Sequence, residues 1–163
     1  MNHQEWYFPF SRDELQASIH NGNCILLQLD VDSRVVAFAV VILKPSDKYR
    51  LSALVPAQRI DRDKEAVLET IFVDKEFRGY GMQSLLIDIM CHLAAERKAT
   101  SLWASVHPEN KFSRTNFEKN GFVKMTSDGP VSLYDGVRDI YCRMINGIGM
   151  KDKSTGELYY YPY

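Results

Sequence analysis

The sequence lacks several features of membrane, secreted and metal-binding proteins. No apolar run in its 163 residues approaches the roughly 18–20 residues of a membrane-spanning helix. The first six residues have neither the positive charge nor the apolar stretch of a signal peptide. The three cysteines, Cys24, Cys91 and Cys142, are scattered and form no Cys-x-x-Cys pair, which argues against a disulfide framework and structural zinc. We therefore expect a cytoplasmic protein with no metal and no membrane contact.

An excess of charge of one sign is also missing. The chain has 20 basic and 21 acidic residues, and its isoelectric point is about 6.4. Such a balance does not favour nucleic acid or an anionic surface as a partner. The length is typical of one domain, which we place at residues 1–146, followed by a tail at 147–163.

Three common catalytic and nucleotide-binding motifs are absent as well. There is no Gly-x-Ser-x-Gly nucleophile elbow and no Gly-Lys-Ser/Thr ending of a phosphate-binding P-loop. Residue 84, where a dinucleotide-binding fingerprint would have its third glycine, is Ser84. The chain does contain a strand-like segment at Val67–Val73, a turn at Arg78–Gly81 and a helical pattern from Met82. A helix that begins just after glycines presents free backbone N–H groups, which favour an anion such as phosphate.

The other segments alternate between helical and strand patterns. Ser11 and Glu14 form a capping box for a first helix that ends near His20. Tyr49–Val55 is a candidate short strand, and Gln58–Glu65 is charged enough to be a solvated loop. The remaining expected elements are strands at Cys24–Leu29, Val35–Leu43, Thr100–Val106, Phe122–Thr126 and Arg138–Ile145, and a short helix at Ser113–Lys119. Trp103 and Phe112 are expected in the core. This order predicts a mixed α/β fold with a parallel strand–helix–strand unit.

Two motifs resemble those of the GNAT N-acetyltransferase superfamily. The acyl-CoA-binding motif of that superfamily is Gln/Arg-x-x-Gly-x-Gly/Ala, and residues 76–81 here read Glu-Phe-Arg-Gly-Tyr-Gly, so that only Glu76 departs from it. A second similarity follows in residues 107–122, where the matching positions are Asn110, Ser113, Glu118, Lys119, Gly121 and Phe122. The resemblance covers residues 65–122 well and the rest of the chain more loosely.

The resemblance implies a fold, a co-substrate and a set of contacts. The fold is a mostly antiparallel central sheet with helices on both faces and one splayed parallel strand pair, between which acetyl-CoA lies. The pantetheine arm would pair with the backbone of Ile71, Phe72 and Val73 as an added strand does. Asn110 and Ser113 would border the CoA channel. The diphosphate would lie on the amides of Arg78, Gly79, Tyr80, Gly81, Met82, Gln83 and Ser84.

Catalysis by direct attack of an amine on the thioester needs a base and a donor for the leaving thiolate. Glu69 is the acidic residue within the strand that flanks the thioester, and its spacing from Ile71 places both side chains on one face of a regular strand. The sequence around Glu69 also resembles the matching segment of spermidine/spermine N-acetyltransferases, in which the matching glutamate is the base. The alternative is a Glu69 on the exposed side of the sheet, with His107 or water as the base.

The usual thiolate donor is missing from the sequence. Many GNAT enzymes have a tyrosine before the Glu-Lys pair, but this chain has Phe117 there. Tyr134, Ser113 or water could substitute, or catalysis could be slow. We therefore expect an N-acetyltransferase that acts on a primary amine of a small molecule or peptide, and the alternative is a non-catalytic acyl-CoA-binding sensor.

The C-terminal tail differs in composition from the rest of the chain. Leu158–Tyr163 contains four tyrosines in six residues. The tail is either disordered, as termini often are, or docked on the domain or on a second copy of the chain. The aromatic content favours docking, and with it a homodimer is one of the open alternatives.

Overall fold

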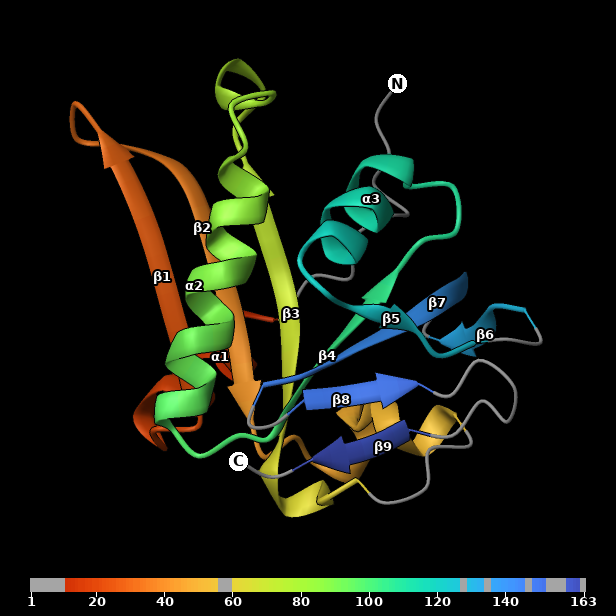
Figure 1. Ribbon diagram of the computed structural model, residues 1–163. Coiled ribbons are helices and arrows are strands. Elements are labelled where there is room, and N and C mark those ends of the chain that lie inside the picture. Colours follow the sequence, from red (N-terminus) through yellow and green to blue (C-terminus); the bar gives the residue numbers. More distant parts are fainter. Residues whose placement is uncertain are drawn as a thin grey trace.

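The computed structural model describes residues 11–55, 60–126, 129–133, 136–145, 148–151 and 158–161 (Figure 1). Its helices are α1 (Arg12–His20), α2 (Met82–Glu96) and α3 (Lys111–Lys119), with short 3-10 turns η2 (Asp47–Tyr49), η3 (Leu51–Leu54), η4 (Arg62–Lys64) and η5 (Lys75–Phe77). Its strands are β1 (Cys24–Val31), β2 (Arg34–Leu43), β3 (Glu65–Val73), β4 (Ser101–Val106), β5 (Val123–Lys124), β6 (Val131–Leu133), β7 (Gly136–Met144), β8 (Ile148–Lys151) and β9 (Leu158–Tyr161).

Strands β1 to β7 form one mixed sheet in the order β1-β2-β3-β4-β7-β5, and β6 pairs with β7. All the pairings are antiparallel except that of β3 with β4, which α2 connects as a crossover (Figure 1). The mixed, mostly antiparallel fold predicted from the sequence is therefore confirmed.

The sheet has a hydrophobic core on each face. On one face, α2 and α3 pack Leu86, Met90 and Phe117 against Leu68 of β3 and other small and branched strand residues. On the other face, Leu51 of η3 packs with side chains that include Val67, Trp103 and Ile140. Helix α1 is joined to this second side by a 2.6 Å hydrogen bond from the Tyr49 hydroxyl in η2 to Glu14.

The parallel pair of β3 and β4 separates along its length. Pairing covers only Glu65–Val67 of β3, opposite Ser101–Trp103 of β4, although both strands continue beyond it. The C-terminal part of β3 stays paired with β2 as far as Val73. This splay leaves one edge of Leu68–Val73 without a strand partner among the described residues.

The edge between β2 and β3 contains a β-bulge. Val40 lies opposite Thr70 and Val41 opposite Leu68, so that Glu69 is the extra residue on the β3 side. A bulge of this kind bends the strand and interrupts the alternation of side chains. Glu69 therefore occupies an irregular position that a strict two-residue period does not describe.

The structure corrects two segments before β3. Tyr49–Val55 is not a strand, because its residues form the end of η2 and all of η3. Glu65 is not in a solvated loop: it begins β3, is 1% exposed, and accepts hydrogen bonds from the Ser52 backbone and hydroxyl. The charged pattern of 58–65 concealed this residue because a buried carboxylate with hydrogen-bonding partners looks no different in sequence from a solvated one.

Beyond the second motif, the structure adds two pairings that the sequence did not suggest. Strand β6 lies between the two turn signals at 128–130 and 135–136, where only loops were expected. In the tail, β8 and β9 form a separate two-stranded antiparallel sheet. Docking of the tail stays a prediction.

Candidate active site

The turn before α2 is shaped by two glycines in a left-handed conformation. Gly79 has φ 86° and Gly81, the N-cap of α2, has φ 77°. A Cβ at either position would have no heavy atom within 4 Å, so open space lies in front of both. No side chain of the described residues caps the first turn of α2. The free N–H groups of this turn therefore face an open approach, which suits a phosphate group.

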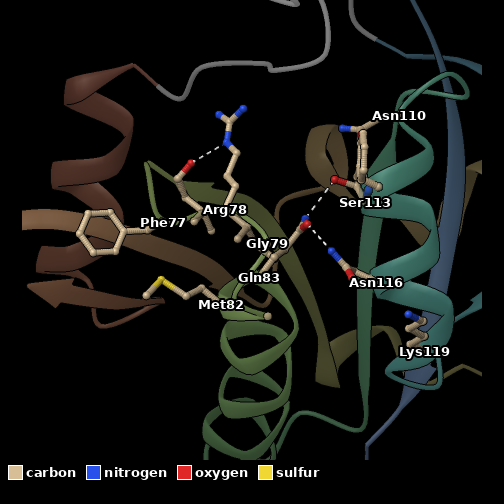
Figure 2. A pocket seen from close by; sticks show the side chains of 13 residues that line it. Phe77, Arg78, Gly79, Met82, Gln83, Asn110, Ser113, Asn116 and Lys119 are labelled. Carbon is tan, nitrogen blue, oxygen red and sulfur yellow. Dashed lines mark hydrogen bonds between the residues drawn. The ribbon is translucent and has the colours of Figure 1, made fainter. Parts of the chain in front are cut away.

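A cleft of about 640 Å³ opens between this turn, β3 and α3 (Figure 2). It is lined by Ile71, Val73, Phe77, Arg78, Gly79, Gly81, Met82, Gln83, Asn110, Phe112, Ser113, Asn116 and Lys119. The structure thus brings together nine of the residues predicted for acyl-CoA from two segments about 30 positions apart. Figure 2 shows Gln83 of α2 reaching across the cleft toward Ser113 and Asn116 of α3.

Three predicted cofactor residues do not line the cleft with their side chains. Phe72 stacks on Phe38 with ring centroids 5.3 Å apart. Tyr80 is 79% exposed, and the Ser84 hydroxyl accepts a 2.6 Å hydrogen bond from Asn120. For these residues the prediction concerned backbone groups, and it stays a prediction.

Four lining residues were missed in the sequence: Phe77, Phe112, Asn116 and Lys119. Phe112 was expected in the core, but it is 83% exposed at the mouth of the cleft. Phe112 is the second residue of α3, two positions after the N-cap Asn110. Helical spacing from Ser113 could have identified Asn116, one turn further along the same helix.

A polar network joins α2 and α3 across the inner end of the cleft. The Asn116 amide Nδ2 donates to Gln83 Oε1 at 2.7 Å, and Gln83 Nε2 donates to Ser113 Oγ at 3.0 Å. Asn110 Oδ1 accepts from the Ser113 backbone N–H at 3.1 Å and so caps α3. These bonds hold Gln83 and Ser113 in fixed positions beside the cleft.

The acidic residues of the turn are neutralised by an arginine from the β1–β2 hairpin. Arg34 forms ion pairs with Asp74 at 2.7 Å and with Glu76 at 3.0 Å. The backbone N–H of Glu76 and the Arg34 guanidinium lower the pKa of the Asp74 carboxyl. Arg78 Nε donates to the Val73 carbonyl at 3.1 Å. Arg34 therefore offsets the negative charge of Glu76, the residue that departs from the acyl-CoA motif.

Glu69 lies in the bulge of β3 and is partly buried. Its carboxylate makes no hydrogen bond or ion pair with any residue that the structure describes. Desolvation by burial, and secondarily the negative charge of Glu14, raises its pKa from 4.5 to about 7. The spacing argument that placed Glu69 on one face with Ile71 assumed a regular strand, which the bulge interrupts, so their common face stays a prediction. Leu68 and Ile71 both pack on the α2 side, which a regular strand does not allow for residues three apart.

Phe117 is 5% exposed and does not line the cleft. Its ring packs in the core against Phe122 and Tyr141, with centroids 4.9 and 6.1 Å apart. Of the hydroxyls considered as substitutes, Ser113 lies in the cleft, and Tyr134 is outside the described residues. Tyr141 points instead to Glu118, to which its hydroxyl donates at 3.2 Å.

In the described part of the chain, no group of three or more His, Cys, Asp and Glu side chains could hold a metal ion. No helix among these residues is long and apolar enough to cross a membrane.

Comparisons with known proteins point to one family. The sequence model described as "Acetyltransferase (GNAT) family" matches residues 1–122. No curated protein sequence matches the chain significantly. Among solved structures, 332 chains match significantly.

Three of these structures illustrate the range of sequence identity and function among the matches. The Escherichia coli ribosomal-protein-S18-alanine N-acetyltransferase is 23% identical with TM-score 0.57, and the match covers 85% of this chain and 79% of that one. The Thermoplasma acidophilum PaiA N-acetyltransferase in complex with coenzyme A is 15% identical with TM-score 0.57, covering 82% and 71%. Aminoglycoside acetyltransferase AAC(6')-Ib with coenzyme A and kanamycin is 14% identical with TM-score 0.62, covering 86% and 80%. At these identities the likeness shows the fold alone.

Proposed function

The chain belongs to the GNAT acetyltransferase family, and on that premise we propose that it transfers an acetyl group from acetyl-CoA to a primary amine by direct attack on the thioester. One observation carries the proposal: the N-terminus of α2, with two open, left-handed glycines and no side-chain cap among the described residues, faces a cleft beside the edge of β3 that no described strand pairs with.

The cleft suits each part of acyl-CoA. The amides from Arg78 to Ser84 would bind the diphosphate, with the positive end of the α2 dipole behind them. The free edge of Ile71–Val73 would pair with the amides of the pantetheine arm. Asn110 and Ser113 would form the opposite wall. Acetyl-CoA supplies the activated acetyl group, and no metal is needed for this chemistry.

Glu69 is the proposed general base. The amine nitrogen attacks the carbonyl carbon, a C–N bond forms, the C–S bond breaks, and the proton lost from nitrogen passes to Glu69 directly or through a water. An ordinary Glu titrates at about 4.3 and an alkyl ammonium at about 10.4, a gap of roughly six pKa units. Because the pKa of Glu69 is raised to about 7, the difference in pKa between the base and the ammonium is roughly halved.

The acceptor is proposed as a primary amine of a small molecule or peptide. The structural neighbours differ widely in this respect: the name of one refers to a ribosomal-protein alanine, and another was solved with kanamycin. The near-neutral charge of the chain favours neither a polycationic nor an acidic acceptor.

Turnover of acetyl-CoA against a panel of amines tests the proposal. Release of free thiol is followed with a thiol reagent, and Gly81→Val serves as the control that should not bind CoA. Amine-dependent thiol release by the wild type, absent from Gly81→Val, is the expected result. CoA binding in calorimetry without turnover across the panel would favour the alternative of a non-catalytic acyl-CoA-binding sensor.

A further inference from the structure

Lys119 lines the cleft, but the proposed acetyl transfer gives it no task. Its side chain is exposed, and its ammonium makes no ion pair or hydrogen bond with any residue that the structure describes. An ammonium group is a compact charge with several donors, so a lysine without a partner at the rim of a cleft is available to a negatively charged ligand.

The charge of the cleft lining favours such a ligand. Among the described lining residues, the charged side chains are Arg78 and Lys119, and none is acidic. The chain as a whole has 20 basic and 21 acidic residues, so the cleft is more positive than the protein that surrounds it. Arg78 Nε already donates to the Val73 carbonyl. Lys119 is therefore the lining cation that has no contact with the described part of the protein.

Lys119 belongs to the part of α3 that lies beside the first turn of α2. Asn116, one helical turn earlier, donates to Gln83 at 2.7 Å, and Asn120, the next residue, donates to Ser84 at 2.6 Å. These two hydrogen bonds flank Lys119 in the chain and hold its segment against α2. Figure 2 shows Lys119 below Asn116 on the α3 wall of the cleft. The diphosphate is proposed to bind at the same turn of α2, so the ammonium flanks that position.

Coenzyme A carries a diphosphate and, on the adjoining ribose, a 3′-phosphate monoester. Such a monoester has a charge of about −1.5 to −2 at pH 7. The backbone amides from Arg78 to Ser84 are proposed to bind the diphosphate, and they leave the monoester without a partner. Because a single ribose separates the two groups, a cation that flanks the diphosphate position suits the monoester both in charge and in place.

We propose that Lys119 binds the 3′-phosphate of coenzyme A and makes the protein selective for acyl donors that carry this group. The inference rests on the proposed binding of acetyl-CoA in the cleft. Lys119 is exposed, so water and salt screen the ion pair, and its contribution to affinity is that of a surface contact. In 3′-dephospho-CoA the monoester is absent, whereas the diphosphate and the pantetheine arm keep their contacts. This ligand therefore isolates the contribution of Lys119.

Calorimetric titrations with CoA and with 3′-dephospho-CoA test the proposal. Lys119→Gln removes the charge and Lys119→Arg keeps it. Lys111→Gln is a matched control, because Lys111 is an exposed lysine of the same helix that does not line the cleft. We expect the wild type to bind CoA about threefold to tenfold more tightly than 3′-dephospho-CoA, between the effects of an exposed ion pair and of a hydrogen bond to a charged group. Lys119→Gln should lose this preference through weaker binding of CoA alone, and the other two variants should keep it.

The preference of the wild type should also shrink as the ionic strength rises toward about 1 M, where the Debye length is about 3 Å. Equal binding of the two ligands by the wild type, or a preference that survives Lys119→Gln, overturns the proposal. An equal loss of affinity for both ligands in Lys119→Gln assigns the lysine to the diphosphate and overturns it as well. Absence of CoA binding by the wild type refutes the proposed site itself, whereas CoA binding without turnover refutes only the acetyl transfer, so these failures are distinguishable.

Discussion

Replacement of Glu69 with Gln tests the proposed base through both stability and rate. The pKa of Glu69 is raised from 4.5 to about 7, first by desolvation and then by Glu14. A carboxyl whose pKa rises on folding binds its proton more tightly in the folded state. Its ionisation therefore lowers the free energy of unfolding as the pH rises from about 4.5 to about 7. The difference between these two pKa values corresponds to a change in the free energy of unfolding of at most about 3 kcal/mol, at 1.36 kcal/mol per pKa unit.

Glu69→Gln removes this ionisation and keeps the shape of the side chain. We expect the variant to match the wild type in stability near pH 4.5 and to exceed it above pH 7 by up to about 3 kcal/mol. At roughly 2–4 °C per kcal/mol for a domain of this size, the Tm should rise by several degrees at pH 8. Its kcat should fall about 10²–10⁴-fold, the usual contribution of a general base, with little change in CoA affinity.

Thermal melts between pH 4.5 and 8.5 and the pH dependence of kcat/KM measure both effects. The wild type should show a rising limb of kcat/KM with a midpoint near pH 7, which Glu69→Gln should lose. Glu96→Gln, at an exposed carboxylate on α2, is the control for the loss of one negative charge. A Glu69→Gln enzyme with the wild-type rate and pH profile would refute the base. Equal Tm values at pH 8 would refute the raised pKa.

Further substitutions test the turn and the core. Gly79→Val and Gly81→Val should abolish CoA binding in calorimetry with a largely intact fold, because a β-branched residue is strained at φ 86° or 77° and fills the open approach to the amides; unchanged affinity would refute the site. Arg34→Ala should raise the KM for acetyl-CoA about two- to fivefold, the range of an exposed ion pair, because it leaves Glu76 uncompensated. Glu76→Gln in the same chain should reverse that rise, and a persistent rise would contradict the charge argument. Phe117→Tyr should lower stability by about 1–3 kcal/mol in chemical denaturation through a buried hydroxyl and should not speed turnover; a faster enzyme would show that the absent tyrosine limits the rate.

Local patterns in the sequence determined the main helices and long strands. The capping box of Ser11 and Glu14 is present as predicted, and α2 begins at Met82 directly after the glycine turn. These features depend on residues a few positions apart, so the chain itself specifies them. The same is true of the two motifs that identified the family, since each is a continuous segment.

Contacts between distant segments decided the rest. Glu65 is buried because Ser52 and η3 pack over it, and the sequence around it shows only charge. The bulge at Glu69 is visible only in the register of β3 against β2, which no pattern within β3 reveals. The burial that raises the pKa of Glu69 and the hydrogen bonds that orient Ser113 both depend on elements more than 25 residues away in sequence. The sequence therefore determined which residues are available for chemistry. The tertiary structure decided their solvation and partners, because both are set by packing between segments that are far apart in the chain.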